Sequence, residues 1–126
     1  MKKTGYKFLF ENMIAWRESR KLVKSIYEIT SQYPKEELYS LTNQIRRAAV
    51  SIASNIAEDS GRSSPKDKSY FYQIAYSSLM EILNQIYTSF DLQYIDEKTF
   101  SDLRDKICAI SYLINALRKS CLPKPL

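Results

Sequence analysis

The sequence predicts an all-α protein, an antiparallel up-down-up-down four-helix bundle, and three observations support this fold. Apolar residues recur at spacings of three and four along four segments, which is the period of an amphipathic helix. The chain of 126 residues contains only two glycines, and its four prolines lie where the periodic segments begin or end. The connections are short, which makes consecutive helices run in opposite directions. We therefore expect a single domain over residues 1–126.

The first helix is expected over about residues 12 to 32. Its inward face runs from Ala15 through Leu22 to Ile26 at helical spacing, and charged residues occupy the outward face. Pro34 is expected to end this helix, because a proline forces the residue before it out of the helical conformation.

The second helix, expected over about residues 38 to 60, is apolar almost all the way round. Its inward stripe is Leu41, Ile45, Ala48, Ile52 and Asn55, and its apolar arc is widened by Ala49, Val50, Ala53, Ile56 and Ala57. Such a helix needs more than one partner surface, so we expect it at the centre of the bundle, at a subunit contact, or at both. Gly61 is expected to take the left-handed conformation of a helix terminus.

The third helix, expected over about residues 65 to 92, has a strong start signal. Ser64 is in the N-cap position, Pro65 is in the first helical position, and Asp67 stands where a carboxylate completes a capping box. The connection from the second helix is therefore expected to be short.

The fourth helix is expected over about residues 97 to 119, with Asp96 as its N-cap. Ile95 and Phe100 occupy the two positions of a hydrophobic staple, a contact that fixes how the chain enters a helix. Pro123 prevents the helix from continuing into the last residues.

Net charge, cysteine content and apolar segments indicate the cellular compartment and the class of partner to expect. Nineteen Lys and Arg against fourteen Asp and Glu give a net charge of +5, which favours anionic partners if the charges cluster and otherwise only aids solubility. Cys108 and Cys121 are separated by roughly 20 Å along a helix, too far for a disulfide. We find no secretory signal and no apolar stretch that could cross a bilayer. We therefore expect a cytoplasmic protein with reduced cysteines and no membrane partner.

Arg46 and Arg47 are candidate nucleic-acid-binding residues, because a guanidinium forms paired hydrogen bonds with phosphate oxygens. Consecutive residues on a helix point about 100° apart, so the two cannot serve one surface equally well. The alternative is that one of them pairs with Glu58 or Glu81 inside the assembly, where an unpaired charge is unfavourable.

Three further basic clusters are candidates for phosphate contact. They are the arm Lys2, Lys3 and Lys7, the corner Arg62, Lys66 and Lys68, and the end Arg118, Lys119 and Lys124. We expect the corner and the start of the first helix to fall at opposite ends of the bundle. Oligomerisation would then be needed to join the clusters into a belt.

Aromatic residues form a candidate oligomer interface. They are Trp16 on the first helix and Tyr70, Tyr72, Tyr76 and Tyr87 on the third. They could stack bases, but an interface is favoured because tyrosine combines a large contact area with a polar edge. Asn55 is expected to be a buried hydrogen-bonding residue that fixes helix register.

No residue pattern in the sequence indicates a catalytic site. The chain contains no histidine, which excludes Glu-x-x-His di-iron ligands, histidine-based triads and the usual zinc sites. With two glycines there is no phosphate-cradling loop. Glu58 and Asp59 are adjacent and so point to different faces. We expect no catalytic residue, no metal and no cofactor.

The second helix carries the segment QIRRAAVSI at residues 44–52, followed by SNIAE at residues 54–58 and by Gly61-Arg62. Together with Trp16 and the Tyr33-Pro34 pair, this pattern resembles the 23S rRNA intervening-sequence proteins, and the resemblance covers roughly residues 10 to 119. The chain departs from the family pattern at Ser40, Ala53 and Asp59, where glycine, proline and glycine are usual. These departures affect the ends of the second helix rather than chemistry.

The resemblance implies a small bacterial helical protein, often encoded within an insertion in a large-subunit ribosomal RNA gene, whose molecular function is poorly defined. The family is similar to the accessory protein of diversity-generating retroelements, a basic pentameric barrel that binds nucleic acid and a reverse transcriptase. A ring-like homopentamer is therefore implied. Two functions stay open: a non-catalytic scaffold that binds RNA or another nucleic acid, and a protein-interaction module without nucleic-acid binding.

Overall fold

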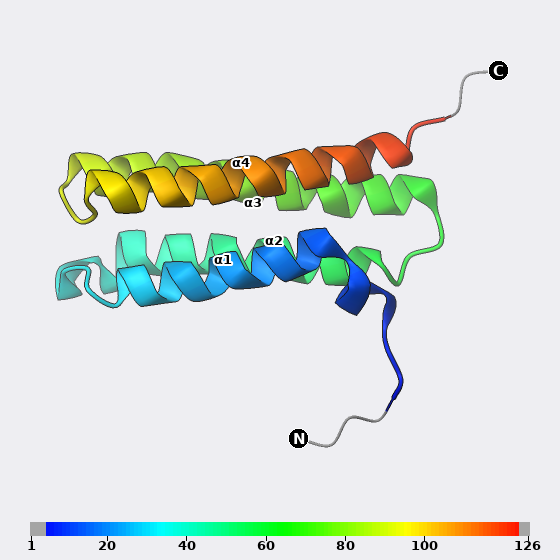
Figure 1. Ribbon diagram of the computed structural model, residues 1–126, viewed down its shortest axis with the longest axis horizontal. Coiled ribbons are helices and arrows are strands. Elements are labelled where there is room, and N and C mark those ends of the chain that lie inside the picture. Colours follow the sequence, from blue (N-terminus) through cyan, green and yellow to red (C-terminus); the bar gives the residue numbers. More distant parts are fainter. Residues whose placement is uncertain (1–4, 124–126) are drawn as a thin grey trace.

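The computed structural model describes residues 5–123, and every regular element in that range is helical. The four α-helices are α1 (Ile14–Thr30), α2 (Asn43–Asp59), α3 (Pro65–Asp91) and α4 (Glu97–Ser120), and the short segments are η1 (Leu9–Asn12), η2 (Lys35–Glu37) and η3 (Leu38–Thr42). Figure 1 shows α1 beside α2 in one layer and α3 beside α4 in the other, with the chain reversing direction at each connection. The all-α prediction is confirmed.

One apolar core joins the four helices. Its fully buried large side chains are Leu22, Ile26, Ile45, Ile52, Ile56, Leu79, Ile82, Ile86, Ile107, Ile110 and Ile114. They recur at spacings of three, four or seven along each helix, so each helix turns one face inward. Burying one such side chain contributes about 1.5–3 kcal/mol, and this face-to-face packing holds the bundle together.

α3 and α4 begin where the N-cap residues of the sequence predict. The Ser64 hydroxyl accepts a hydrogen bond of 3.4 Å from the Asp67 N–H, and the Asp96 carboxylate accepts one of 2.8 Å from the Thr99 N–H. Hydrogen bonding from the Thr99 side chain, and then from its backbone N–H, lowers the pKa of Asp96. Within the described chain, the return bond from Asp67 to Ser64 that would complete the capping box does not form.

The first two helices differ from the sequence prediction at their ends. α1 ends at Thr30, before Pro34 can act, because the Thr30 carbonyl accepts the Tyr33 N–H at 3.0 Å and closes a tighter turn. The segment Leu38–Thr42, predicted as the start of the second helix, is a π-helical turn instead. The wider turn admits one extra residue, and Thr42 rather than Leu41 is then buried.

The prediction that Gly61 adopts a left-handed conformation is wrong. The chain leaves α2 through right-handed turns, in which the N–H of Gly61 donates to the Glu58 carbonyl at 3.2 Å. Among residues 5–123, the non-glycine residue with a positive φ is Gln93, at 64°, just after α3. There Gln93 and Tyr94 donate to the carbonyls of Phe90 and Ser89, each at 2.9 Å, which is the Schellman pattern of a helix terminus.

α2 lies between α1 and α3 and packs against both. Its apolar arc is only partly covered by this single bundle, because Val50 is 41% exposed and Ala53 and Ala57 are half-buried. The expectation that α2 is central is confirmed, and a strip of its apolar surface faces water.

Candidate nucleic-acid interface

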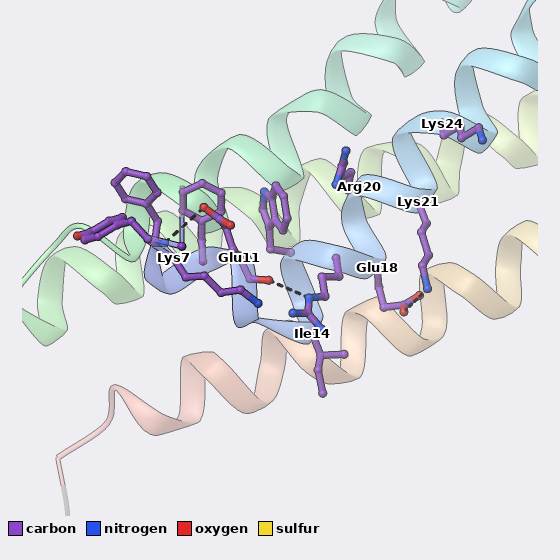
Figure 2. A pocket seen from close by; sticks show the side chains of 13 residues that line it. Lys7, Glu11, Ile14, Glu18, Arg20, Lys21 and Lys24 are labelled. Atoms are coloured by element: carbon purple, nitrogen blue, oxygen red, sulfur yellow. Dashed lines mark hydrogen bonds and ion pairs between the residues drawn. The ribbon is translucent and has the colours of Figure 1, made fainter. Parts of the chain in front are cut away.

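A groove of about 1200 Å³ lies between the chain segment that precedes α1 and the first turns of α1 itself (Figure 2). One wall is the segment 5–11, which includes most of η1, and the other is α1 as far as Lys24. We call this the aromatic–basic groove.

The chain locally folds back to make this groove. The Met13 N–H donates to the Phe10 carbonyl at 3.0 Å, which closes η1 just before α1 begins. The Arg17 side chain then donates from Nε to the Glu11 carbonyl at 2.8 Å. An α1 side chain is thereby tied to the segment that forms the opposite wall.

Positive charge dominates the lining of the groove. Its five cations are Lys7, Arg17, Arg20, Lys21 and Lys24, and all of them are exposed. Two carboxylates line the groove with them: Glu18 lies 3.2 Å from Lys21, and Glu11 accepts the Phe8 N–H at 3.4 Å. Outside the lining, Glu28 lies 4.0 Å from Lys24. The groove therefore attracts anions, most strongly at low ionic strength.

A row of aromatic rings lies beside these cations. Tyr6 and Phe8 meet edge to face at 4.8 Å between ring centroids, and Phe8 is nearly parallel to Phe10 at 6.4 Å. Phe10 meets Trp16 edge-on at 4.9 Å, and the Arg20 guanidinium lies 5.5 Å from the Trp16 ring. Trp16 also packs against the core, so this end of the row is anchored to the bundle.

The sequence prediction found only part of this site. Lys7 and Trp16 were expected to be functional, the first in a basic arm and the second in an interface. Arg17, Arg20, Lys21 and Lys24 belong to the charged outward face that the sequence predicts for the first helix, with no functional role assigned. The signal that could have found them is their recurrence every three or four residues, directly after an aromatic-rich segment. Lys2 and Lys3 lie outside the described residues.

The other basic clusters lie at the same end of the molecule as the groove, contrary to the prediction. Figure 1 shows that α1 begins, α2 ends, α3 begins and α4 ends at one end of the bundle. The predicted separation was wrong because an antiparallel pair places the start of its first helix beside the end of its second. The groove, the corner at Arg62 and the end at Arg118 therefore share one end.

The basic corner is partly engaged in local contacts. Arg62 lies 3.4 Å from the Glu58 carboxylate, and its guanidinium is 4.8 Å from the Phe71 ring centroid. Lys66 is exposed, whereas Lys68 is half-buried. Lys66 is therefore the side chain of the corner that is most open to an anion.

Charge is distributed unequally along the bundle. The half containing the groove, residues 5–24, 52–78 and 109–123, carries ten Lys and Arg against five Asp and Glu. The other half, residues 25–51 and 79–108, carries six against nine and is the acidic end. We call the first half the basic end.

Arg46 and Arg47 lie outside the basic end, near the start of α2. Arg46 is half-buried against α1, where its Nε donates to Thr30 Oγ1 at 2.8 Å and its guanidinium lies 4.7 Å from the Tyr27 ring. Arg47 is exposed. Neither forms an ion pair with Glu58 or Glu81 in the described part of the chain, so the predicted pairing is not found there.

The two carboxylates predicted to take part in that pairing have other partners. Glu58 is the partner of Arg62, and Glu81 accepts a hydrogen bond of 3.3 Å from the Gln85 amide. Both carboxylates are exposed, and both of these contacts lie within or next to their own helix.

The candidate interface tyrosines differ in exposure. Tyr70 and Tyr87 are 61% and 43% exposed and are available for contacts. Tyr76 is half-buried beneath Arg118, whose guanidinium lies 5.1 Å from its ring. Tyr72 is buried in the core, so its assignment to an interface was wrong.

Asn55 is half-buried rather than part of the core seam. Its amide donates to the Ser51 carbonyl at 2.7 Å and to Ser51 Oγ at 3.0 Å, both within α2. Ser51 Oγ in turn accepts the Ser78 hydroxyl of α3 at 3.0 Å. Asn55 therefore acts on helix register only through Ser51.

A buried carboxyl group that the sequence did not reveal lies under the basic corner. Asp59 is fully buried, and neither carboxylate oxygen accepts a hydrogen bond of normal geometry from residues 5–123. Burial raises the pKa of Asp59, opposed by the Tyr72 hydroxyl and then by Lys68 and Arg62. Burial and the nearby carboxylate also raise the pKa of Tyr72.

Residues 5–123 contain no cluster of three side chains suited to hold a metal ion. Over the same range, none of the helices combines the length and apolarity that crossing a bilayer requires. The described side chains offer positive charge and flat aromatic surface at one end, which is chemistry for binding an anion with planar groups.

Comparison with known proteins places this fold in a family. The chain is similar in structure to a crystallised protein of unknown function from the S23 ribosomal protein family of Bacteroides thetaiotaomicron VPI-5482, with a TM-score of 0.77 at 19% sequence identity. That match covers 84% of this chain and 96% of the other. A comparison with curated proteins gave no match. The family model for 23S rRNA-intervening sequence proteins matches residues 11–116. The chain therefore belongs to the 23S rRNA-intervening sequence protein family.

Proposed function

We propose that this protein is a non-catalytic, cytoplasmic scaffold that binds RNA or another nucleic acid through its basic end. The observation that carries this proposal is the groove, in which five exposed cations face only two carboxylates. Lys66 adds an exposed cation at the same end of the bundle. A phosphate backbone is the polyanion that such a surface binds through counterion release, with weak sequence specificity.

The proposal includes a homo-oligomer, for which the resemblance to the pentameric accessory protein suggests five copies. The uncovered strip on α2, formed by Val50, Ala53 and Ala57, supports a contact between copies, since small apolar side chains allow helices to approach closely. Repeating a weak basic surface around a ring raises affinity for a long polyanion through avidity.

Binding to a labelled structured RNA over a salt series tests the proposal. Affinity should fall steeply with salt, with a slope of about 0.7–0.9 for each phosphate contact. The double variant Lys21→Gln, Lys24→Gln should bind less tightly and show a shallower slope. The matched control Lys35→Gln, Lys98→Gln removes the same charge from the other half of the molecule and should leave the slope unchanged.

Mass-calibrated chromatography of the same samples would establish that the oligomer is intact. No RNA binding by an intact oligomer at low salt would overturn the proposal. The second candidate, a protein-interaction module, would then be favoured, because Tyr39, Tyr70 and Tyr112 are 90%, 61% and 76% exposed and offer contact area for a protein partner.

A further inference from the structure

We propose that the aromatic–basic groove binds unpaired nucleotides, with bases stacked on its aromatic row and phosphates held by the cations of α1. This inference rests on the proposed function and assigns to it a kind of ligand, a single strand. It also assigns a place, which is the groove rather than the basic end in general.

The exposed rings give the first argument. Tyr6 is 70% exposed and Phe8 is 56% exposed, although Tyr6 meets Phe8 and Phe8 lies beside Phe10. Both rings line the groove, and neither belongs to the apolar core. Every nucleobase has a π-face, so a row of accessible rings accepts bases of any sequence.

The position of the cations gives the second argument. Arg17, Lys21 and Lys24 follow one another along α1 at spacings of four and three residues, close to one helical turn of about 5.4 Å. Lys7 approaches from the opposite wall of the groove (Figure 2). In Figure 2, Lys7 lies at the segment that carries the rings, and Lys21 and Lys24 extend the line of positive charge along α1 away from it. A single strand whose bases stack on the rings would continue along these cations with its phosphates.

The cations and the exposed rings of the groove together favour a single strand over a duplex and over an acidic peptide. A duplex hides the faces of its bases in the stack, so it could use the cations but not Tyr6 and Phe8. An acidic peptide would satisfy the cations and leave the aromatic row without planar partners. The combination of both features favours a single strand.

The chain has a built-in reporter at this site, because Trp16 is its only tryptophan. The full-length protein would be titrated with a non-self-complementary RNA strand of about 12 nucleotides, which is within the usual size range for such sites. The matching blunt duplex, inorganic polyphosphate and a polyglutamate peptide would be titrated in parallel. We expect the single strand to quench Trp16 emission strongly and saturably, and the other three to change it little.

The double variant Tyr6→Leu, Phe8→Leu removes the exposed rings, retains apolar character and leaves Trp16 in place. It should lose about tenfold or more in affinity for the single strand and little for the duplex. The matched control is Tyr112→Leu, at a tyrosine that is 76% exposed on α4, and it should bind like the parent. Circular dichroism would verify that both variants are folded.

Equal losses for single strand and duplex, or an unchanged affinity of the double variant, would overturn the groove assignment while leaving the proposed function intact. Quenching by polyglutamate equal to that by RNA would also overturn it and indicate a protein ligand. A different result would overturn the proposed function itself: neither the single strand, nor the duplex, nor polyphosphate would bind.

Discussion

Asp59 shows how a single side chain can work against the stability of the fold. Its carboxyl group is fully enclosed at the end of α2, and its two oxygens lack the hydrogen bonds that a buried carboxylate needs. The Tyr72 hydroxyl, and then the cations Lys68 and Arg62, favour the charged form only in part, so burial still raises the pKa of Asp59. Such a group is more stable in the folded protein when it is protonated.

Replacing the carboxylate with an amide, in Asp59→Asn, should therefore stabilise the protein at neutral pH by about 1–3 kcal/mol. The raised pKa means that the folded state holds a proton that the unfolded state releases above its ordinary pKa of 3.8. Stability of the parent then falls as pH rises from that value through the raised pKa, whereas the amide does not titrate.

Urea denaturation of parent and variant across a pH series measures this difference. The advantage of Asp59→Asn should grow as the pH is raised and should be small in acid. A variant that is less stable than the parent at neutral pH would show that the attraction of Lys68 and Arg62 for the carboxylate exceeds the cost of burying it.

Gln93 is a second residue that lowers the stability of the fold, in this case through its backbone conformation. A φ of 64° is unfavourable for a side chain with a Cβ, and the Schellman turn after α3 imposes it. Gln93→Gly should raise the free energy of unfolding by about 0.5–1 kcal/mol, after allowing for the added freedom of the unfolded chain. Thermal unfolding of the variant checks this, and an unchanged or lower midpoint would contradict it.

At the scale of elements, sequence was informative wherever the signal was local. The caps at Ser64 and Asp96 predicted the starts of α3 and α4, because a side-chain oxygen and a nearby backbone N–H suffice to begin a helix. The start of α2 depended on tertiary fit, because the π turn before it buries Thr42, and no short-range pattern encodes that fit.

The candidate site was missed for a similar reason. Half of the groove is an irregular segment that folds back on α1, and it is held there by the Arg17 bond to the Glu11 carbonyl and the contact of Phe10 with Trp16. Helical periodicity places Arg17, Lys21 and Lys24 on an outward face but says nothing of what lies opposite that face.

Phe10 should be the residue that holds η1 in place. Phe10→Ala would remove the ring that meets Trp16 at 4.9 Å, and we expect a loss of about 1–2 kcal/mol for this half-buried side chain. The Trp16 emission maximum should move to longer wavelength as its surroundings become wetter, while helical circular dichroism is retained. A variant with the parent's emission and stability would show that η1 is held by other contacts.

At the scale of the whole molecule, the uncovered strip on α2 gives the most direct test of assembly. Val50→Glu places a charge on an apolar residue that is already 41% exposed, so the isolated bundle should remain folded. In an assembly that covers this strip, a buried unpaired carboxylate would be strongly unfavourable. We expect chromatography with mass calibration to show a shift from oligomer to monomer.

Gln44→Glu is the matched control, since Gln44 is exposed on the polar side of the same helix and receives the same charge. It should leave the oligomer intact. If Val50→Glu keeps the size of the parent, the contact between copies lies on another face of the bundle.

The unequal charge of the two halves has a consequence for any ring built from this chain. A cyclic assembly repeats one orientation, so a ring whose axis runs along the helices turns every basic end to one rim and every acidic end to the other. The two rims then have opposite polarity, and rings would stack rim to rim into columns at low ionic strength and separate as salt screens the attraction. A polyanion bound to the basic rim would block this stacking, because it occupies the surface that the next ring needs.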